Sequence, residues 1–222
     1  MRRFDFPVDL PHAKAVNQTL AEVRRLRVSG IVLAVLFAAA AVWLILIGQA
    51  WSFVVAAVVI VAALTAAWVA VWAPRKVGTI QHLYRDSPLV PAVISELRPR
   101  GMTLLALVDI AKPETGVHRY ALVARDVTAV PGHRVQVGER VPCVAVLSDR
   151  TTRNTSGAWQ MVSPMPIAWG TRDASVLREA AAAIDETEWK VVEGKLSLSD
   201  EVTASDERRL VLDPKDLPPD LR

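Results

Sequence analysis

The sequence predicts an α+β membrane protein, in which a two-helix transmembrane hairpin precedes a small β-barrel domain of the OB or SH3-like kind and a C-terminal helix. Three observations predict this fold. Residues 28–73 contain no Asp, Glu, Lys or Arg, although the chain holds 26 basic and 23 acidic side chains. Short β-type runs bounded by Pro and Gly follow, and then an alanine-rich helical repeat. We therefore divide the chain into residues 1–27, 28–73, 77–171 and 172–222.

The uncharged segment consists of two apolar runs, residues 28–47 and 51–73. Each is close to the ~20 residues that an α-helix needs to cross ~30 Å of hydrocarbon. Only Gly48, Gln49 and Ala50 separate them, so two crossing helices must be antiparallel neighbours. One long bent helix is the alternative, but Gly48 and Gln49 interrupt the apolar pattern where a turn is required. We expect the first run to be retained and not cleaved as a signal peptide, because a second span follows it directly.

The flanks of the two runs predict their orientation. Three arginines precede the first run, a basic pair follows the second, and the turn between them is uncharged. By the positive-inside rule, we expect a multi-pass protein of the inner membrane with both termini cytoplasmic. Tryptophans near both ends of the second run are placed as interfacial anchors, and the basic collar could bind lipid headgroups. The predicted membrane-interface residues are Arg24, Arg25, Arg27, Trp51, Trp72, Arg75 and Lys76.

Small residues recur in the second run at spacings of three and four, which lets helix backbones approach closely. They are Ala62, Ala63, Ala66, Ala67 and Ala70. The stripe is expected to be the seam of the hairpin itself, with a homo-oligomer interface as the alternative. Neither run contains a charged residue or a histidine, which argues against a channel or transporter made by this hairpin.

The first 27 residues begin with an irregular lead and continue as one amphipathic helix, predicted over residues 12–27. The helix is expected to lie on the membrane surface or to pack on the soluble domain before it continues into the first span.

The region after the hairpin predicts five strands, at residues 92–97, 102–110, 119–130, 141–147 and 159–162. A closed or nearly closed barrel would remove their exposed edges, and a simple meander is the alternative. Residues 173–184 repeat as a helix that Asp173 can cap. Beyond it the sequence is acidic, and we expect only partial order to Leu212 and a frayed end.

The residues that usually carry chemistry are scattered. The four histidines lack metal-ligand spacing, no glycine-rich phosphate loop is present, and Cys143 lies in an apolar run that disfavours a reactive thiolate. We predict no catalytic residue, no cofactor and no metal, so the protein is not expected to be an enzyme. An enzyme would need a pocket built from distant residues, such as Asp109, Arg125 and His133.

Residues 163–170 read SPMPIAWG, in which prolines disfavour a helix or a central strand while Met, Ile and Trp are costly to expose. The segment is expected either to close one end of the barrel or to form a strip for a partner protein. In the second case Met165, Ile167 and Trp169 are the partner-binding residues.

The paired spans, the following β-rich region and the 163–169 run resemble a family of uncharacterised actinobacterial two-span membrane proteins of unknown function. That resemblance implies no reaction and no ligand. A barrel on a short membrane hairpin is also similar in layout to the NfeD-like proteins, whose OB domains assist partners in the membrane.

The function that the sequence favours is that of a non-catalytic adaptor or accessory subunit of a membrane protein complex. Its expected partners are membrane lipid and a membrane or cytoplasmic protein, and a homo-oligomer is the further alternative. The alternatives are an unrecognised enzyme and an OB-type module for lipid headgroups or single-stranded nucleic acid. Nucleic acid is disfavoured because few aromatic side chains are available for base stacking, despite basic residues at 119, 125, 134 and 140.

Overall fold

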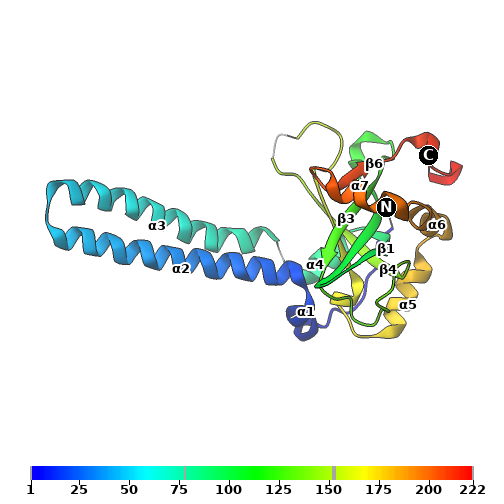
Figure 1. The fold of residues 1–222 in the computed structure, drawn as a ribbon, viewed down its shortest axis with the longest axis horizontal. Helices are drawn as coiled ribbons and strands as arrows, with labels where there is room; N and C mark the ends of the chain where they lie inside the picture. The colour runs from blue at the N-terminus through cyan, green and yellow to red at the C-terminus, as the bar shows by residue number, and fades with distance from the viewer. Residues whose placement is uncertain (1, 78, 152–153, 222) are drawn as a thin grey trace. The chain divides into compact units, whose positions relative to one another are not determined.

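The computed structural model describes residues 2–77, 79–151 and 154–221, except for the side chains of residues 73–77. The chain forms two compact units (Figure 1). One comprises residues 17–80, and the other combines residues up to Val16 with those from Gln81 onward. Two long apolar helices, a curled antiparallel sheet and C-terminal helices confirm the predicted α+β class with a helical hairpin.

The first unit is an antiparallel pair of long helices, α2 (Gln18–Ile47) and α3 (Ala50–Val77). The side chain of Asn17 begins α2 by accepting hydrogen bonds from the backbone N–H groups of Thr19 and Leu20, at 3.0 and 3.4 Å. Gly48 ends α2 in the left-handed conformation, with φ 72°, which a residue with a Cβ adopts at a cost. Both helices are long and apolar enough to cross a membrane.

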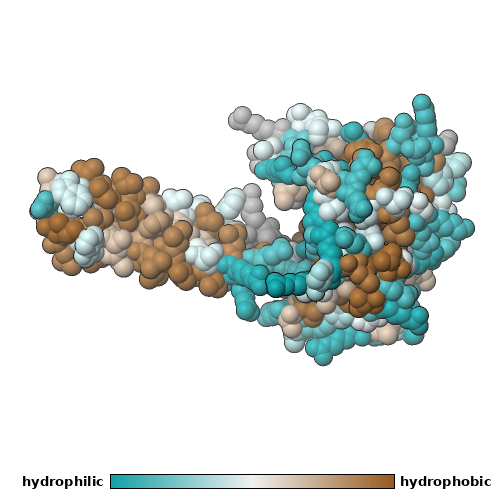
Figure 2. Space-filling model, viewed as in Figure 1, coloured by the Kyte–Doolittle hydropathy of each residue, from teal (hydrophilic) through white to brown (hydrophobic). Residues whose placement is uncertain are grey.

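The hairpin is held together by small residues. A Cβ placed on Gly30 would lie 3.0 Å from Cβ of Ala70, so the two backbones approach as closely as the side chains allow. Ala41, Ala56 and Ala70 are buried in the hairpin together with Leu44, whereas most of its other large apolar side chains are exposed. Figure 2 shows the resulting apolar surface along both helices. This agrees with the seam expected inside the hairpin.

The helix predicted over residues 12–27 is divided in two. The short helix α1 (Leu10–Val16) belongs to the second unit, and α2 begins at Gln18. The division occurs at Asn17, whose backbone is extended and whose side chain caps α2. The prediction missed this break because the spacing of apolar residues continues across Asn17. A polar capping residue does not change that spacing.

The second unit is built on a six-stranded antiparallel sheet, preceded by α4 (Ile80–Asp86). The strands are β1 (Leu89–Arg98), β2 (Gly101–Asp109), β3 (Tyr120–Val127), β4 (Arg140–Ser148), β5 (Met161–Pro166) and β6 (Arg209–Val211), in the order β5-β4-β1-β2-β3-β6. The first four correspond to predicted strands. The fifth starts two residues later than predicted and includes Pro164 and Pro166, which an edge strand tolerates because one side needs no N–H donors.

The sheet curls into a half-barrel with β5 and β6 at its edges, rather than a closed barrel. The register of β1 against β2 shifts between Ile94 and Glu96, and such an irregularity bends a strand. Arg125 on β3 spans the curl, donating to Ser163 Oγ at 2.8 Å and to the carbonyl oxygen of Pro164 at 3.0 Å, both on β5. A side chain thus joins two strands that three others separate in the sheet.

The C-terminal region is more ordered than predicted. Helix α5 (Ala174–Ala183) begins at Asp173, whose side chain accepts from the N–H of Ser175, as expected of a cap. Two unpredicted helices follow, α6 (Glu186–Gly194) and α7 (Ser199–Ala204), and then β6. The end of the chain was predicted to be frayed, but Leu217 and Leu221 are buried. Apolar residues spaced too far apart for a periodic pattern pack individually against the domain.

Candidate functional site

The predicted membrane-interface residues lie on the two long helices. Arg24, Arg25 and Arg27 are exposed on α2 before its apolar stretch. Trp51 and Trp72 are 55% and 46% exposed, and Trp51 Nε1 donates to Gln49 Oε1 at 2.8 Å at the turn. The side chains of Arg75 and Lys76 lie outside the described residues. Their role at a lipid interface stays a prediction.

The predicted partner-binding strip is not accessible. Met165, Ile167 and Trp169 are each 0% exposed, because β5 and the turn after it lie against the interior of the half-barrel. Trp169 Nε1 donates to the carbonyl oxygen of Ala129 at 2.8 Å, and the Arg125 guanidinium lies 5.1 Å from its ring centroid. Of the two expectations for this segment, the partner-binding strip is therefore wrong, because these three side chains are buried in the core of the domain.

The N-terminal segment, residues 2–16, is an integral part of the soluble domain. Phe6 is 8% exposed, and its ring meets that of Tyr84 edge-on with centroids 5.1 Å apart. Asp9 N–H donates to the carbonyl oxygen of Gly170 at 2.8 Å. The buried ring of His12 contacts the carbonyl oxygen of Ala168 through Nε2 at 3.0 Å. The residues before the hairpin therefore fold together with the residues after it.

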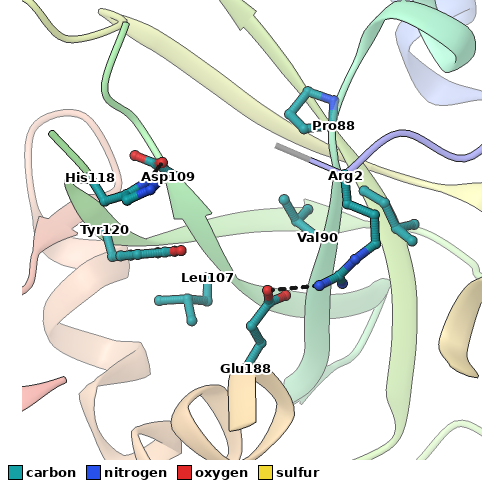
Figure 3. Close-up of a pocket in the computed structure, with 9 residues that line it drawn as sticks. Arg2, Pro88, Val90, Leu107, Asp109, His118, Tyr120 and Glu188 are labelled. Carbon is teal, nitrogen blue, oxygen red and sulfur yellow. Dashed lines mark hydrogen bonds and ion pairs between the residues drawn. The ribbon is translucent and has the colours of Figure 1, made fainter. Parts of the chain in front are cut away.

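A polar cavity of about 210 Å³ lies between α6 and the sheet (Figure 3). Its lining residues come from the N-terminal segment, β2, α6, and β1 and β3 with the residues just before them; they are Arg2, Pro88, Leu89, Val90, Leu107, Asp109, His118, Tyr120 and Glu188. Arg2 Nη2 donates to Glu188 Oε1 at 3.2 Å, and His118 Nδ1 lies 2.6 Å from Asp109 Oδ2. The cavity thus brings together residues from both ends of the chain.

Burial governs the titration of two groups in this cavity. It raises the pKa of Tyr120 to about 12, and the negative charge of Asp109 acts in the same direction. Burial also raises the pKa of Glu188, against the opposing effect of Arg2. Tyr120 therefore keeps its proton at physiological pH and can donate a hydrogen bond into the cavity.

Sequence reasoning missed this cavity apart from Asp109. Arg2 and Glu188 are separated by nearly the whole chain, so no local spacing relates them. One signal was available: the pairing of Asp109 with Tyr120 follows from the register of the predicted hairpin between β2 and β3.

The residues named for an unrecognised enzyme have separate partners. Asp109 binds His118, Arg125 binds β5, and His133 lies 3.6 Å from Glu139. Burial raises the pKa of the Cys143 thiol, which keeps it protonated. Within residues 2–77, 79–151 and 154–221, no group of three or more His, Cys, Asp or Glu side chains is placed to hold a metal ion.

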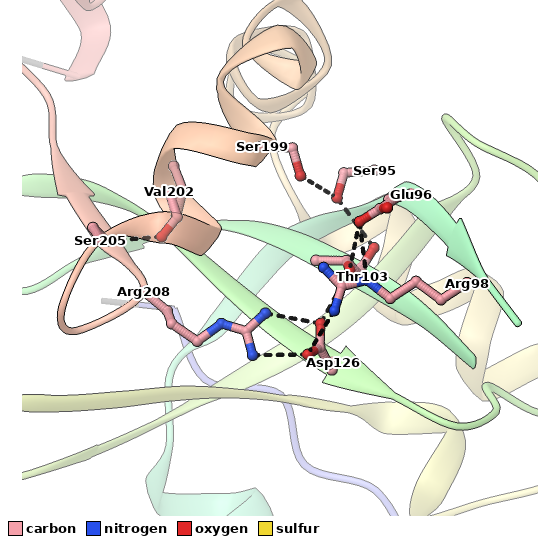
Figure 4. A network of polar contacts seen from close by, with 9 residues as sticks. All are labelled: Ser95, Glu96, Arg98, Thr103, Asp126, Ser199, Val202, Ser205 and Arg208. Atoms are coloured by element: carbon pink, nitrogen blue, oxygen red, sulfur yellow. Dashed lines mark hydrogen bonds and ion pairs between the residues drawn. The ribbon is translucent and has the colours of Figure 1, made fainter. Parts of the chain in front are cut away.

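A second polar cluster surrounds Asp126 on β3 (Figure 4). Its carboxylate accepts from both Nη atoms of Arg208 at 2.8 Å, from Arg98 Nη1 at 3.0 Å and from Thr103 Oγ1 at 3.0 Å. These hydrogen bonds, that of Arg208 most strongly, hold the pKa of Asp126 below its usual value. The cluster connects the turn before β6, which contains Arg208, to the β1–β2 hairpin. Because both carboxylate oxygens of Asp126 already accept hydrogen bonds, we assign the cluster a structural role.

Two of the arginines considered for nucleic acid are bound within the domain. Arg125 spans the curl of the sheet. Arg140 donates to Glu186 and to Glu193, at 2.7 and 2.5 Å, and lies over the ring of Trp189. Both side chains are therefore already engaged by the fold.

Two long apolar helices attached to an α+β half-barrel define a class of membrane-anchored domain proteins. Residues 75–200 match a family model described as "Protein of unknown function (DUF3239)". That match covers more than half of the 222 residues, and the chain belongs to the DUF3239 family.

One solved structure supports the membrane assignment. It is described as "Crystal structure of a putative membrane protein from Corynebacterium diphtheriae", is 38% identical and has a TM-score of 0.52. The alignment covers 56% of this chain and 99% of that one. No match was found among curated proteins. Together the comparisons support the resemblance to an uncharacterised actinobacterial membrane family and give no support to the likeness with NfeD-like proteins.

Proposed function

We propose that this protein is a non-catalytic adaptor or accessory subunit, which a two-helix hairpin holds at the inner membrane with its soluble domain in the cytoplasm. One observation supports the topology in this proposal: residues 2–16 and the chain from Gln81 onward form a single folded domain. A domain built from both flanks of a membrane segment requires both flanks to lie on the same side. The segment must therefore cross an even number of times, and the hairpin provides two crossings.

The charge distribution supports the cytoplasmic side. Arg24, Arg25 and Arg27 stand exposed where α2 enters its apolar stretch, and Gly48 and Gln49 form an uncharged turn at the far end. Positively charged flanks are retained in the cytoplasm. The non-catalytic part of the proposal is supported by the separate partners of Asp109, Arg125 and His133, the residues named for an unrecognised enzyme.

Cysteine labelling tests the topology. Cys143 is the chain's single cysteine and is buried, so it contributes little background. We expect Gln49→Cys to react with a membrane-impermeant maleimide in intact cells. Val135→Cys, at an exposed position of the domain, should react only after the inner membrane is opened. Labelling of both variants, or of Val135→Cys alone, in intact cells would refute the topology.

Photo-crosslinking of the full chain in native membranes tests the adaptor role. Photoreactive residues at Val117 and Val135, which are 70% and 66% exposed, should give a reproducible adduct with one protein. The buried position Val144 is the matched control and should give none. A monodisperse monomer without adducts from any exposed position would count against the adaptor role.

Binding of anionic lipid is a second candidate function, favoured by the exposed cluster of Arg24, Arg25 and Arg27. Basic residues near an anionic surface contribute about 1 kcal/mol each. Reversing all three to Glu should reduce the anionic lipid that co-purifies with the protein, as measured by native mass spectrometry. Arg100→Glu, at an exposed position of the soluble domain, is the control. Unchanged lipid content in the triple variant would exclude this candidate.

A further inference from the structure

The cavity beside α6 has room for a molecule of a few non-hydrogen atoms. Its volume is about 210 Å³, well above the roughly 10–15 Å³ that a single water molecule needs. Leu107 and Val90 supply apolar lining, and Arg2, Tyr120 and Glu188 supply polar groups (Figure 3). A cavity with an apolar lining and a few convergent polar groups has the composition of ligand sites, and its volume lies below the roughly 300 Å³ at which typical sites begin, so it suits only a very small molecule.

Not every polar group in the cavity is available to a ligand. Asp109 Oδ1 accepts from the backbone N–H groups of Ala111 and Arg119, each at 3.0 Å, and Oδ2 is paired with His118. Asp109 therefore organises the loop between β2 and β3, and we assign it no ligand contact.

The pair formed by Arg2 and Glu188 is different. Only Arg2 Nη2 reaches Glu188, and Arg2 Nη1 is buried with no hydrogen-bond partner among the described residues. The Arg2 side chain as a whole is 35% exposed, and Nη1 is its buried end. An N–H without an acceptor costs free energy, so this atom is free to donate to water or to a ligand that enters the cavity. Tyr120, whose side chain points toward the middle of the residues drawn in Figure 3, brings a hydroxyl to the same cavity.

The charges decide what kind of molecule fits. Arg2 and Glu188 place a cation and an anion 3.2 Å apart in the lining. A plain anion is attracted by Arg2 but repelled by Glu188 and Asp109, and a plain cation is repelled by Arg2. We propose that the cavity binds a small zwitterion of the amino acid type. Its carboxylate accepts from Arg2 Nη1 and Tyr120, its ammonium donates to Glu188, and a short aliphatic side chain contacts Leu107 and Val90.

Calorimetric titration of the full chain in detergent with L-alanine tests the proposal. L-alanine should bind saturably. Acetate and methylammonium carry one charge each and should bind with affinities at least about tenfold lower, because each loses a charge-assisted hydrogen bond. Absence of a saturable signal with L-alanine at millimolar concentrations overturns the proposal. Acetate or methylammonium binding as tightly as L-alanine also overturns it.

Variants locate the binding. Arg2→Gln and Tyr120→Phe should each weaken L-alanine binding about tenfold. Tyr120→Phe removes only the hydroxyl group, so it still tests the site if Arg2→Gln lowers the unfolding temperature. Arg3→Gln is the matched control, because Arg3 is adjacent in sequence and exposed. Equal effects of Arg2→Gln and Arg3→Gln, or no effect of Tyr120→Phe, refute the site. The result is independent of the adaptor role, which the crosslinking experiment tests separately.

Discussion

The ring of Phe6 packs edge-on against the ring of Tyr84, with centroids 5.1 Å apart and planes at 67°. One residue precedes the membrane hairpin and the other follows it. Both rings also border Gly170, where an added Cβ would lie 2.8 Å from Tyr84 and 2.9 Å from Phe6. Three distant parts of the chain therefore meet at one point of the soluble domain, and its stability depends on all three.

Replacing Phe6 by Ala should destabilise the domain by about 3–5 kcal/mol, because a buried ring is lost and a cavity remains. Denaturant unfolding of the full chain in detergent, followed by tryptophan fluorescence, measures the change. Phe53→Ala is the control, since Phe53 is 49% exposed on α3. A Phe6→Ala protein as stable as the control would contradict the inclusion of the N-terminal segment in the domain.

Gly170→Ala should destabilise the domain by about 1–3 kcal/mol through overpacking. The backbone at Gly170 has φ −98°, which any residue can adopt, so the cost arises only from the two rings. Combining it with Phe6→Leu should recover part of the loss, and a double-mutant cycle measures that coupling. Gly194→Ala is the matched control, because nothing lies within 4 Å of its added Cβ. Purely additive effects of the two substitutions would argue against the steric explanation.

Arg125→Met should weaken the closure of the half-barrel. It removes the donors to Ser163 Oγ and the Pro164 carbonyl oxygen, and hydrogen bonds from a charged group contribute about 1.5–3 kcal/mol each. The same unfolding experiment measures the loss. Arg119→Met, at an exposed position just before β3, should change stability by less than about 0.5 kcal/mol. Similar losses for the two variants would remove the assigned role of Arg125.

His133 should make stability depend on pH. Burial lowers the pKa of His133 below its usual 6.5, against the opposing effect of Glu139, so the folded protein binds this proton less readily than the unfolded chain. The stability that depends on neutral His133 is complete above pH 6.5 and falls as the pH drops through the lower pKa of the folded state. His133→Gln should flatten the fall in unfolding temperature below that pH. His82→Gln, at an exposed position, should leave the slope as it is. An unchanged slope in His133→Gln would show that other groups govern it.

The sequence located the parts of the site unevenly. The basic cluster at Arg24, Arg25 and Arg27 can be recognised in the sequence, because the three residues are close together and directly precede the first apolar run. Arg2 and Glu188 could not be paired in advance, because only the packing of α6 and the N-terminal segment on the sheet brings them to 3.2 Å. At Met165, Ile167 and Trp169 the sequence suggested a binding strip that the structure does not support. These side chains are apolar because they pack in the interior of the domain.

The sequence by itself determined the two apolar helices, the turn at Gly48, four of the strands and the cap at Asp173, because each depends on local composition and spacing. Only the tertiary structure decided that the sheet stops at a half-barrel, that β6 joins β3, and that Phe6 meets Tyr84. Those features depend on the burial of side chains far apart along the chain. The hydrophobic effect is non-directional, so it does not specify which apolar side chains come into contact. The packing of the whole domain decides that.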